Sequence, residues 1–316
     1  MDIIFDFLFL IFYITTIMSI KLPKVFLDSG NPEETKKAKA LLGFLDGQTT
    51  NPTLICKHPE AASYLNKGKK LTQKELLNFY KQVVLEIRKI ISGSISVEVY
   101  ADWETKTSDL LNQAEELSSW ARNLHIKFPS IPQAINAGRQ FAQKGGLCNM
   151  TLVFDEIQAA SVYSALSPIS ANSNLPGKHF ISPFLGRWDD RGYMGLSLIK
   201  NIKKLYKKFD RLNHFKKPPV EILSASIRNL HHFYGSIFLG TDILTVPLKI
   251  IQEWIEEEKW IPDVNYRIDS HGLKSLVYQD LPYQKDYAKY KIEKEGNSLL
   301  SEGLKKFLSD WKSLLE

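Results

Sequence analysis

Short runs of β-forming residues alternate with longer segments of helical periodicity along most of the chain. Parallel strands need a crossover connection, usually a helix, so this alternation is typical of βα units and a parallel sheet. One helical segment begins at a Thr72 cap and another at Ser108. Eight strands, each followed by a helix, predict an α/β fold of the (β/α)₈ barrel type. The predicted strands are Lys24–Asp28, Asp46–Thr50, Ile95–Val99, Leu124–Phe128, Leu147–Val153, His179–Phe184, Val220–Ala225 and Ile243–Val246.

The length and composition fit one large barrel domain. The chain has 316 residues, of which 44% are hydrophobic and 24% charged, as in ordinary globular proteins. The segment 254–297 is less regular and rich in Tyr and Lys, so we interpret it as an insertion. A last amphipathic helix is expected over "SEGLKKFLSDWKSLLE". Residues 21–316 are therefore predicted to form the barrel, its insertion and a C-terminal helix.

The first twenty residues, "MDIIFDFLFLIFYITTIMSI", differ from the rest because they are almost continuously apolar. They lack the basic start and the small-residue cleavage site of a signal peptide. As a membrane span the segment is short, and Asp6 would be costly at depth. We expect translation to start at Met18, and a membrane anchor over residues 1–20 is the alternative.

Charge and cysteine content restrict the class of ligand and the compartment. The formal net charge of +6 suits anionic ligands such as sugar phosphates but is too diffuse to indicate a nucleic-acid partner. The basic segment 200–217 has helical period and is interpreted as an amphipathic barrel helix with a solvated face.

Cys56 and Cys148 have no metal or redox spacing, which favours a reducing cytosol. His231 and His232 lack a third ligand at a useful spacing, so no metal is predicted.

Polar residues occur at or near the C-terminal ends of four predicted strands: Glu98, Lys127, Asn149 and Ser182. In a (β/α)₈ barrel this end carries the active site, built from several strands. Strand packing alone does not require a carboxylate, an amine, an amide and a hydroxyl at one mouth of the barrel. The alternative is that some of these side chains point outward and cap helices.

Lys127 poses the sharpest question, because lysine is rarely buried without a partner. One interpretation is that "LHIKFPS" is exposed and Lys127 is solvated. The other is a dry pocket, which favours the neutral, nucleophilic amine that forms Schiff bases with carbonyl compounds. Local sequence does not decide between them.

Eight motifs together resemble one family. The segments "VFLDSGN", "DGQTTNPTL", "SVEV", "IKFPS", "NMTLVF", "SPFLGRWDDRG", "SASIRN" and "TDILTVP" occur in the order and spacing of transaldolases. The resemblance covers Lys24 to about Lys249, and "GLKKFLSDW" is similar to the C-terminal helix of shorter members. It implies a cytoplasmic aldolase-type barrel without cofactor or metal, which transfers a dihydroxyacetone unit between sugar phosphates through a lysine Schiff base.

The resemblance also implies catalytic roles. Lys127 matches the Schiff-base lysine and Asp28 the carboxylate that exchanges a proton with the C4 hydroxyl. Glu98 matches the carboxylate that acts through a water, and Thr151 the hydroxyl that holds this water. Read without the resemblance, Asp28 could cap the following helix, and Glu98 could form a structural ion pair with Lys127.

The same resemblance assigns the binding residues. Asn51, Asn149 and Ser182 match contacts to the dihydroxyacetone unit, although Asn51 could also be a turn residue before Pro52. Arg187, Ser226 and Arg228 match the phosphate site, where guanidinium groups suit a dianion. One departure is local: Ser130 and Ile131 follow the lysine motif where the family commonly has a Thr.

Two other functions remain open from the sequence. A fructose 6-phosphate aldolase resembles transaldolase but releases free dihydroxyacetone; such enzymes tend to have Gln and Tyr where this chain has Glu98 and Phe184. A non-catalytic sugar-phosphate-binding protein, tethered by residues 1–20, is the alternative from another class. Partners are expected to be sugar phosphates and not nucleic acid or membrane, and a homo-oligomer is an open option.

Overall fold

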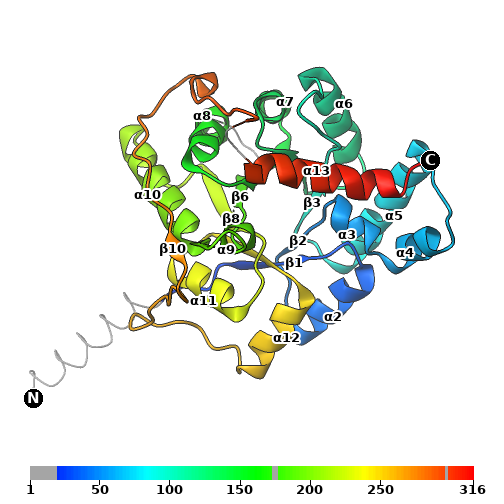
Figure 1. Ribbon diagram of the computed structural model, residues 1–316, viewed down its shortest axis with the longest axis horizontal. Coiled ribbons are helices and arrows are strands. Elements are labelled where there is room, and N and C mark those ends of the chain that lie inside the picture. The colour runs from blue at the N-terminus through cyan, green and yellow to red at the C-terminus, as the bar shows by residue number, and fades with distance from the viewer. Residues whose placement is uncertain (1–19, 173–176, 296–297) are drawn as a thin grey trace, which may run out of the picture.

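The computed structural model describes residues 20–172, 177–295 and 298–316, and its centre is a closed barrel of parallel strands (Figure 1). Around the barrel the strands follow the order β1-β2-β3-β4-β5-β6-β8-β9. Their bounds are Lys24–Asp28, Gly47–Thr49, Ser94–Glu98, Leu124–Pro129, Leu147–Val153, His179–Pro183, Val220–Ser224 and Ile243–Val246. The predicted (β/α)₈ barrel is confirmed, and each predicted strand is present with its ends within two residues.

Helices surround the barrel, and several begin where local chemistry predicts. The Thr72 hydroxyl and the Glu75 carboxylate form a reciprocal capping box at the start of α5. Proline occupies the first turn of α2, α3, α4 and α7, where its missing N–H costs nothing. The helices are α2 Pro32–Leu42, α3 Pro52–Cys56, α4 Pro59–Asn66, α5 Gln73–Ile90, α6 Thr107–Ser118, α7 Pro132–Gln143, α8 Glu156–Asn172, α9 Gly186–Asp189, α10 Leu196–Leu212, α11 Leu230–Phe238, α12 Leu248–Glu256 and α13 Ser298–Ser313.

The irregular segment begins slightly later than the sequence indicated. Trp254 is fully buried on the inner face of α12, so the segment starts after Glu256. It runs along the outside of α11 and α10 toward α8 before joining α13 (Figure 1). On the way, β10 (Lys274–Ser275) pairs with β7 (Tyr193–Met194). The sequence did not predict this two-residue ladder, because it is too short to show a periodic pattern.

Residues 1–19 of the apolar segment 1–20 lie outside the described part of the chain, so the expectation about this segment stays a prediction. Among the residues that are described, no helix is both long enough and apolar enough to cross a membrane.

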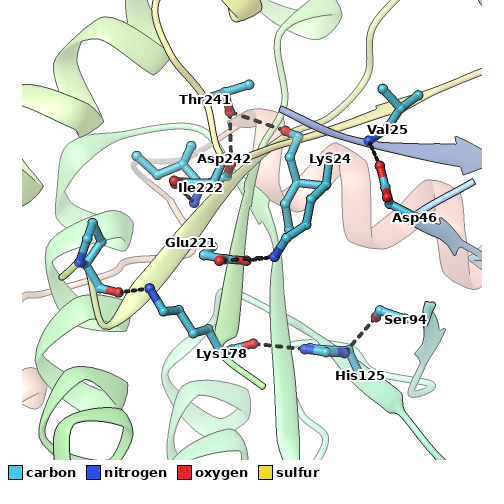
Figure 2. A network of polar contacts seen from close by, with 12 residues as sticks. Lys24, Val25, Asp46, Ser94, His125, Lys178, Glu221, Ile222, Thr241 and Asp242 are labelled. Carbon is cyan, nitrogen blue, oxygen red and sulfur yellow. Dashed lines mark hydrogen bonds and ion pairs between the residues drawn. The ribbon is translucent and has the colours of Figure 1, made fainter. Parts of the chain in front are cut away.

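A network of polar contacts closes the N-terminal end of the barrel (Figure 2). Lys24 and Glu221 form an ion pair at 2.8 Å, and the Asp46 carboxylate accepts the backbone N–H of Val25 at 2.8 Å. His125 contacts the Ser94 hydroxyl at 2.7 Å and the Lys178 carbonyl at 2.9 Å. These contacts join strands, or the turns that lead into them, that are one or two positions apart around the barrel, so they hold the sheet closed at the end opposite the C-terminal mouth.

His125 forms part of the barrel core. Its ring stacks on Phe180 with centroids 3.9 Å apart, and Phe180 in turn contacts Phe26 edge-on. His125 and Lys127 lie two residues apart on β4 and so face the same side. His125 therefore fills a layer of the interior beneath Lys127.

Helix α13 crosses the C-terminal mouth of the barrel, from beside α8 to beside α5 (Figure 1). Arg191 and Glu302 pair near its start, and Thr53 donates to the Asp310 carboxylate near its end. Gly303 allows close packing on β5, because a Cβ there would lie 2.9 Å from a methyl group of Leu152. The helix is thus fixed at both ends over the mouth.

The buried histidines should make the fold acid-sensitive. Burial lowers the pKa of His125 from 6.5 to about 3 and that of His179 to about 4. The unfolded chain therefore binds more protons below pH 6.5, and stability falls as the pH drops from there toward the folded pKa values. We expect His125→Gln to reduce the loss of unfolding free energy between pH 7 and pH 5 by roughly 1–2 kcal/mol.

The measurement is urea unfolding at each pH, with His214→Asn as the control at an exposed position. A loss of stability as large in His125→Gln as in the wild type would show that another group carries the acid sensitivity.

Candidate active site

A cavity of about 310 Å³ opens at the C-terminal mouth of the barrel. It gathers residues from six strands, β1, β2, β4, β5, β6 and β9, and from three helices, α3, α9 and α13. Of the residues that the sequence singled out, it is lined by Asp28, Asn51, Lys127, Thr151, Ser182, Phe184, Arg187, Ser226 and Arg228. Glu98 and Asn149 lie just behind this wall, in contact with its members.

Lys127 lies near the end of β4, and its side chain is only 4% exposed. The Nζ atom lies 3.0 Å from Glu98 Oε2 and donates to the Thr50 carbonyl at 3.2 Å. Glu98 and Lys127 are direct neighbours in the β3–β4 register. The solvated interpretation of Lys127 is therefore wrong, and the ion pair that the sequence left open as an alternative is present.

Burial raises the pKa of two carboxyl groups beside this amine. For Glu98 desolvation is the main cause, and the nearby Lys127 charge opposes it. For Asp28 desolvation again dominates, while Lys127 and a 2.6 Å hydrogen bond from Thr49 act in the opposite direction. A carboxyl group whose pKa is raised toward neutrality is suited to exchanging protons.

Asp28 does not cap the helix that follows it. Asn31 caps α2 instead, accepting the N–H of Glu33 at 3.0 Å. Asp28 faces the cavity, and its hydrogen-bond donor Thr49 is itself 2.5 Å from Thr245. The geometry therefore leaves the Asp28 carboxylate available to a ligand.

The side-chain amides of Asn51 and Asn149 differ in the hydrogen bonds that they already form. Asn149 is fully buried; it donates to Ser96 at 3.0 Å and accepts from Ser182 at 2.6 Å. The Asn51 oxygen caps α3 by accepting the N–H of Leu54 at 2.9 Å, so its amide NH₂ remains the group for a ligand. The turn interpretation of Asn51 and its place in the cavity wall are thus compatible.

An irregularity in β5 lies beside Thr151. The register of β5 against β6 shifts between Met150 and Val153, and Leu152 has a positive φ of 56°. Such bulges redirect neighbouring side chains. The Thr151 hydroxyl is buried, and in the described part of the chain it has no hydrogen-bond partner.

Arg187, Ser226 and Arg228 form a cationic wall of the cavity. Both carboxylate oxygens of Asp190 accept from Arg228, one of them at 2.7 Å. Arg187 forms no ion pair within the described ranges, and partial burial lowers its pKa. Gly186 is needed for this packing, because a Cβ there would lie 2.3 Å from Arg228 Nε.

The sequence reasoning missed eight further residues that line the cavity: Thr49, Thr53, Leu54, Lys57, Ala225, Thr245, Lys306 and Phe307. Lys57 is the C-cap of α3, and Lys306 and Phe307 belong to α13. Local sequence offered no signal for Lys306 and Phe307, because their position depends on how α13 lies across the mouth.

Over residues 20–172, 177–295 and 298–316, no group of three or more His, Cys, Asp or Glu is arranged to hold a metal ion. His232 instead contacts Asp189 at 2.6 Å.

A closed (β/α)₈ barrel with a buried amine–carboxylate pair at its C-terminal mouth is suited to Schiff-base chemistry on carbonyl compounds. The sequence profile described as transaldolase/fructose-6-phosphate aldolase matches residues 25–316. The chain belongs to this family.

Several curated relatives carry the name "Probable transaldolase". The protein from Geobacillus kaustophilus is 34% identical over 249 residues, which cover 77% of this chain and 98% of that protein. The protein from Carboxydothermus hydrogenoformans is 37% identical over 231 residues, covering 73% and 89%. The protein from Thermoplasma volcanium is 34% identical over 236 residues, covering 75% and 89%.

The cationic wall predicts selectivity for phosphorylated substrates. Arg187→Gln should weaken binding of fructose 6-phosphate by about 1.5–3 kcal/mol, the range for a hydrogen bond to a charged group. Arg228→Gln should have at least this effect, since it also leaves the Asp190 carboxylate unpaired beside the cavity. Steady-state KM values for fructose 6-phosphate provide the measurement.

Reaction with unphosphorylated dihydroxyacetone should change little in both variants. Arg122→Gln, at an exposed position outside the cavity, is the control. Equal losses for dihydroxyacetone and fructose 6-phosphate would mean that these arginines support the fold and do not bind phosphate.

Proposed function

We propose that this chain is a transaldolase, which moves a dihydroxyacetone unit from a ketose phosphate to an aldose phosphate through a lysine Schiff base. The observation that carries the proposal is the buried Lys127–Glu98 pair, 3.0 Å apart, with Asp28 in the same pocket. Membership of the family and the names of the relatives support it. The donors would be sedoheptulose 7-phosphate and fructose 6-phosphate, with glyceraldehyde 3-phosphate and erythrose 4-phosphate as acceptors.

The first half of the reaction uses the buried pair. The Lys127 amine attacks the C2 carbonyl of the donor, a carbon–nitrogen bond forms, and the carbonyl oxygen leaves as water. Glu98 would pass protons through a water during this step and Thr151 would hold that water, roles supported by the 3.0 Å Lys127–Glu98 distance and the unpartnered Thr151 hydroxyl in the described chain.

The second half uses Asp28. Its carboxylate accepts the proton of the C4 hydroxyl, the C3–C4 bond breaks, and the electron pair moves into the iminium on Lys127, while the fragment from C4 onward leaves as an aldose phosphate. The resulting three-carbon enamine attacks the acceptor aldehyde, and Asp28 returns the proton to the new hydroxyl. Hydrolysis of the iminium then releases the product ketose.

The three-carbon unit must stay bound until an acceptor arrives. The Asn51 amide and the Asn149–Ser182 pair supply hydrogen bonds for its hydroxyl groups. Phe184 is 8% exposed, lines the cavity and packs edge-on against Phe154. Its apolar face keeps water from that side of the intermediate, which favours transfer over release as free dihydroxyacetone.

The fructose 6-phosphate aldolase alternative stays within the same family and differs in the fate of this unit. A non-catalytic sugar-phosphate-binding protein is less well supported, because binding alone gives no reason for a dry lysine–carboxylate pair. We further place the enzyme in the cytoplasm, which agrees with two free cysteines in the described chain.

Trapping with borohydride tests the Schiff base. With fructose 6-phosphate present, borohydride should reduce an adduct onto Lys127, identified by mass mapping of peptides. Lys127→Met should lose turnover by at least about three orders of magnitude, since the covalent route disappears, while circular dichroism shows a folded barrel. Lys178, a lysine that does not line this pocket, serves as the control position. An adduct on another lysine would overturn the mechanism.

Phe184→Tyr tests the balance between transfer and release. The wild type should release dihydroxyacetone slowly from fructose 6-phosphate alone and react much faster once erythrose 4-phosphate is added. A tyrosine hydroxyl near the iminium can hold a water, so the variant should release free dihydroxyacetone roughly tenfold faster without acceptor. A coupled assay for dihydroxyacetone measures both rates. Rapid release by the wild type without acceptor would identify an aldolase.

A further inference from the structure

The catalytic pocket contains two separate groups of cations. Arg187 and Arg228 form one wall, and Lys57 and Lys306 line the same cavity. The proposed reaction uses only the arginines for phosphate. The two lysines are therefore cations in the pocket to which the mechanism assigns no task.

The strand order places the two groups on opposite sides of the mouth. Lys57 is the C-cap of α3, which follows β2, whereas Arg187 lies in α9, which follows β6. In the closed barrel β2 and β6 are four strands apart in either direction. Lys127, on β4, lies between them. In the proposed reaction the arginines hold the phosphate and Lys127 binds the carbonyl carbon, so the side of the mouth that carries Lys57 would face the carbonyl end of the ketose.

Lys306 is held toward α3 by an acid from its own helix. Its Nζ atom lies 2.5 Å from Asp310 Oδ1, and the other oxygen of Asp310 accepts from Thr53 on α3. The Cys56 thiol, also on α3, donates to the Asp310 carbonyl at 3.0 Å. Asp310 therefore ties α13 to α3 and orients the ammonium group at the cavity.

Lys57 carries a charge that no acid neutralises. In the described part of the chain no carboxylate lies within ion-pair distance of its Nζ, and the residue is exposed. It lies close enough to Asp28 to lower the pKa of that carboxyl group slightly. A dianion in the cavity would pair with the Lys57 ammonium and share the Lys306 ammonium with Asp310.

We propose that Lys57 and Lys306 form a second anion-binding subsite, which takes a phosphate-type dianion beside the three-carbon unit. This inference rests on the proposed catalytic pocket but goes beyond its reaction. The dianion could reach the subsite in two ways: as the ester of dihydroxyacetone phosphate, or as free inorganic phosphate next to unphosphorylated dihydroxyacetone. In either case Asp310 is a positioning residue that acts through Lys306.

The first experiment measures binding of inorganic phosphate by calorimetry to the full-length Arg187→Gln/Arg228→Gln protein, in which the arginine wall is removed. Binding should persist there and become about tenfold weaker or more when Lys57→Gln or Lys306→Gln is added, as expected for a lost contact between charged groups. The matched controls are Lys305→Gln on the exposed side of α13 and Lys67→Gln at the end of α4, which should bind like the parent.

The second experiment separates the two sources. Borohydride trapping on Lys127 is compared for dihydroxyacetone and dihydroxyacetone phosphate. An adduct with the phosphate ester that is lost in Lys306→Gln, while the unphosphorylated adduct remains, identifies the ester. An adduct with dihydroxyacetone alone, together with lysine-dependent phosphate binding, identifies free phosphate.

The proposal is overturned if phosphate binding disappears with the arginines alone, or if the lysine variants bind like their controls. Failure to trap dihydroxyacetone on wild-type Lys127 would count against the proposed function instead, because phosphate binding does not need the Schiff base. The two failures are therefore distinguishable.

Discussion

The site depends on one buried ion pair, between Lys127 and Glu98. Each partner is almost fully removed from water, and either charge alone would carry a large desolvation penalty. Their pairing is set by the barrel itself, since both belong to adjacent strands in direct register. A shift of one residue in that register would turn one of the partners away from the interior. Sheet closure and chemistry are thus linked at a single contact.

Structural contacts and reactive groups lie at opposite ends of the barrel axis. At the N-terminal end, ion pairs and hydrogen bonds such as Lys24–Glu221 join strands of the barrel (Figure 2). The stacked His125–Phe180 layer fills the middle of the interior. At the C-terminal end the strands finish in polar groups around an open pocket. This separation lets the pocket hold groups that would destabilise a core.

Helix α13 completes the site from outside the barrel. It contributes Phe307 as an apolar wall and Lys306 as a cation, and it is anchored by Asp310 near its C-terminal end. An apolar wall beside a covalent intermediate limits the access of water. Because the same helix also carries charge into the pocket, it influences both how long the intermediate persists and which anions enter.

The sequence by itself determined the barrel and most of the reacting groups. The strand bounds, the Thr72 capping box and the polar ends of the strands follow from local periodicity and capping chemistry, which act within a few residues. The ordered motifs added roles for Lys127, Asp28 and Glu98. These roles stay predictions, while the structure shows that the three side chains meet.

Only the tertiary structure decided which further residues share the pocket. The Thr53–Asp310 contact that anchors α13 joins positions 257 residues apart, and no local pattern encodes such a pairing. The bidentate Asp190–Arg228 pair and the short β7–β10 ladder likewise depend on how distant segments pack. The tertiary structure also decided whether Lys127 is solvated or buried. Burial is set by the strands and helices that surround a residue and not by its neighbours in the chain.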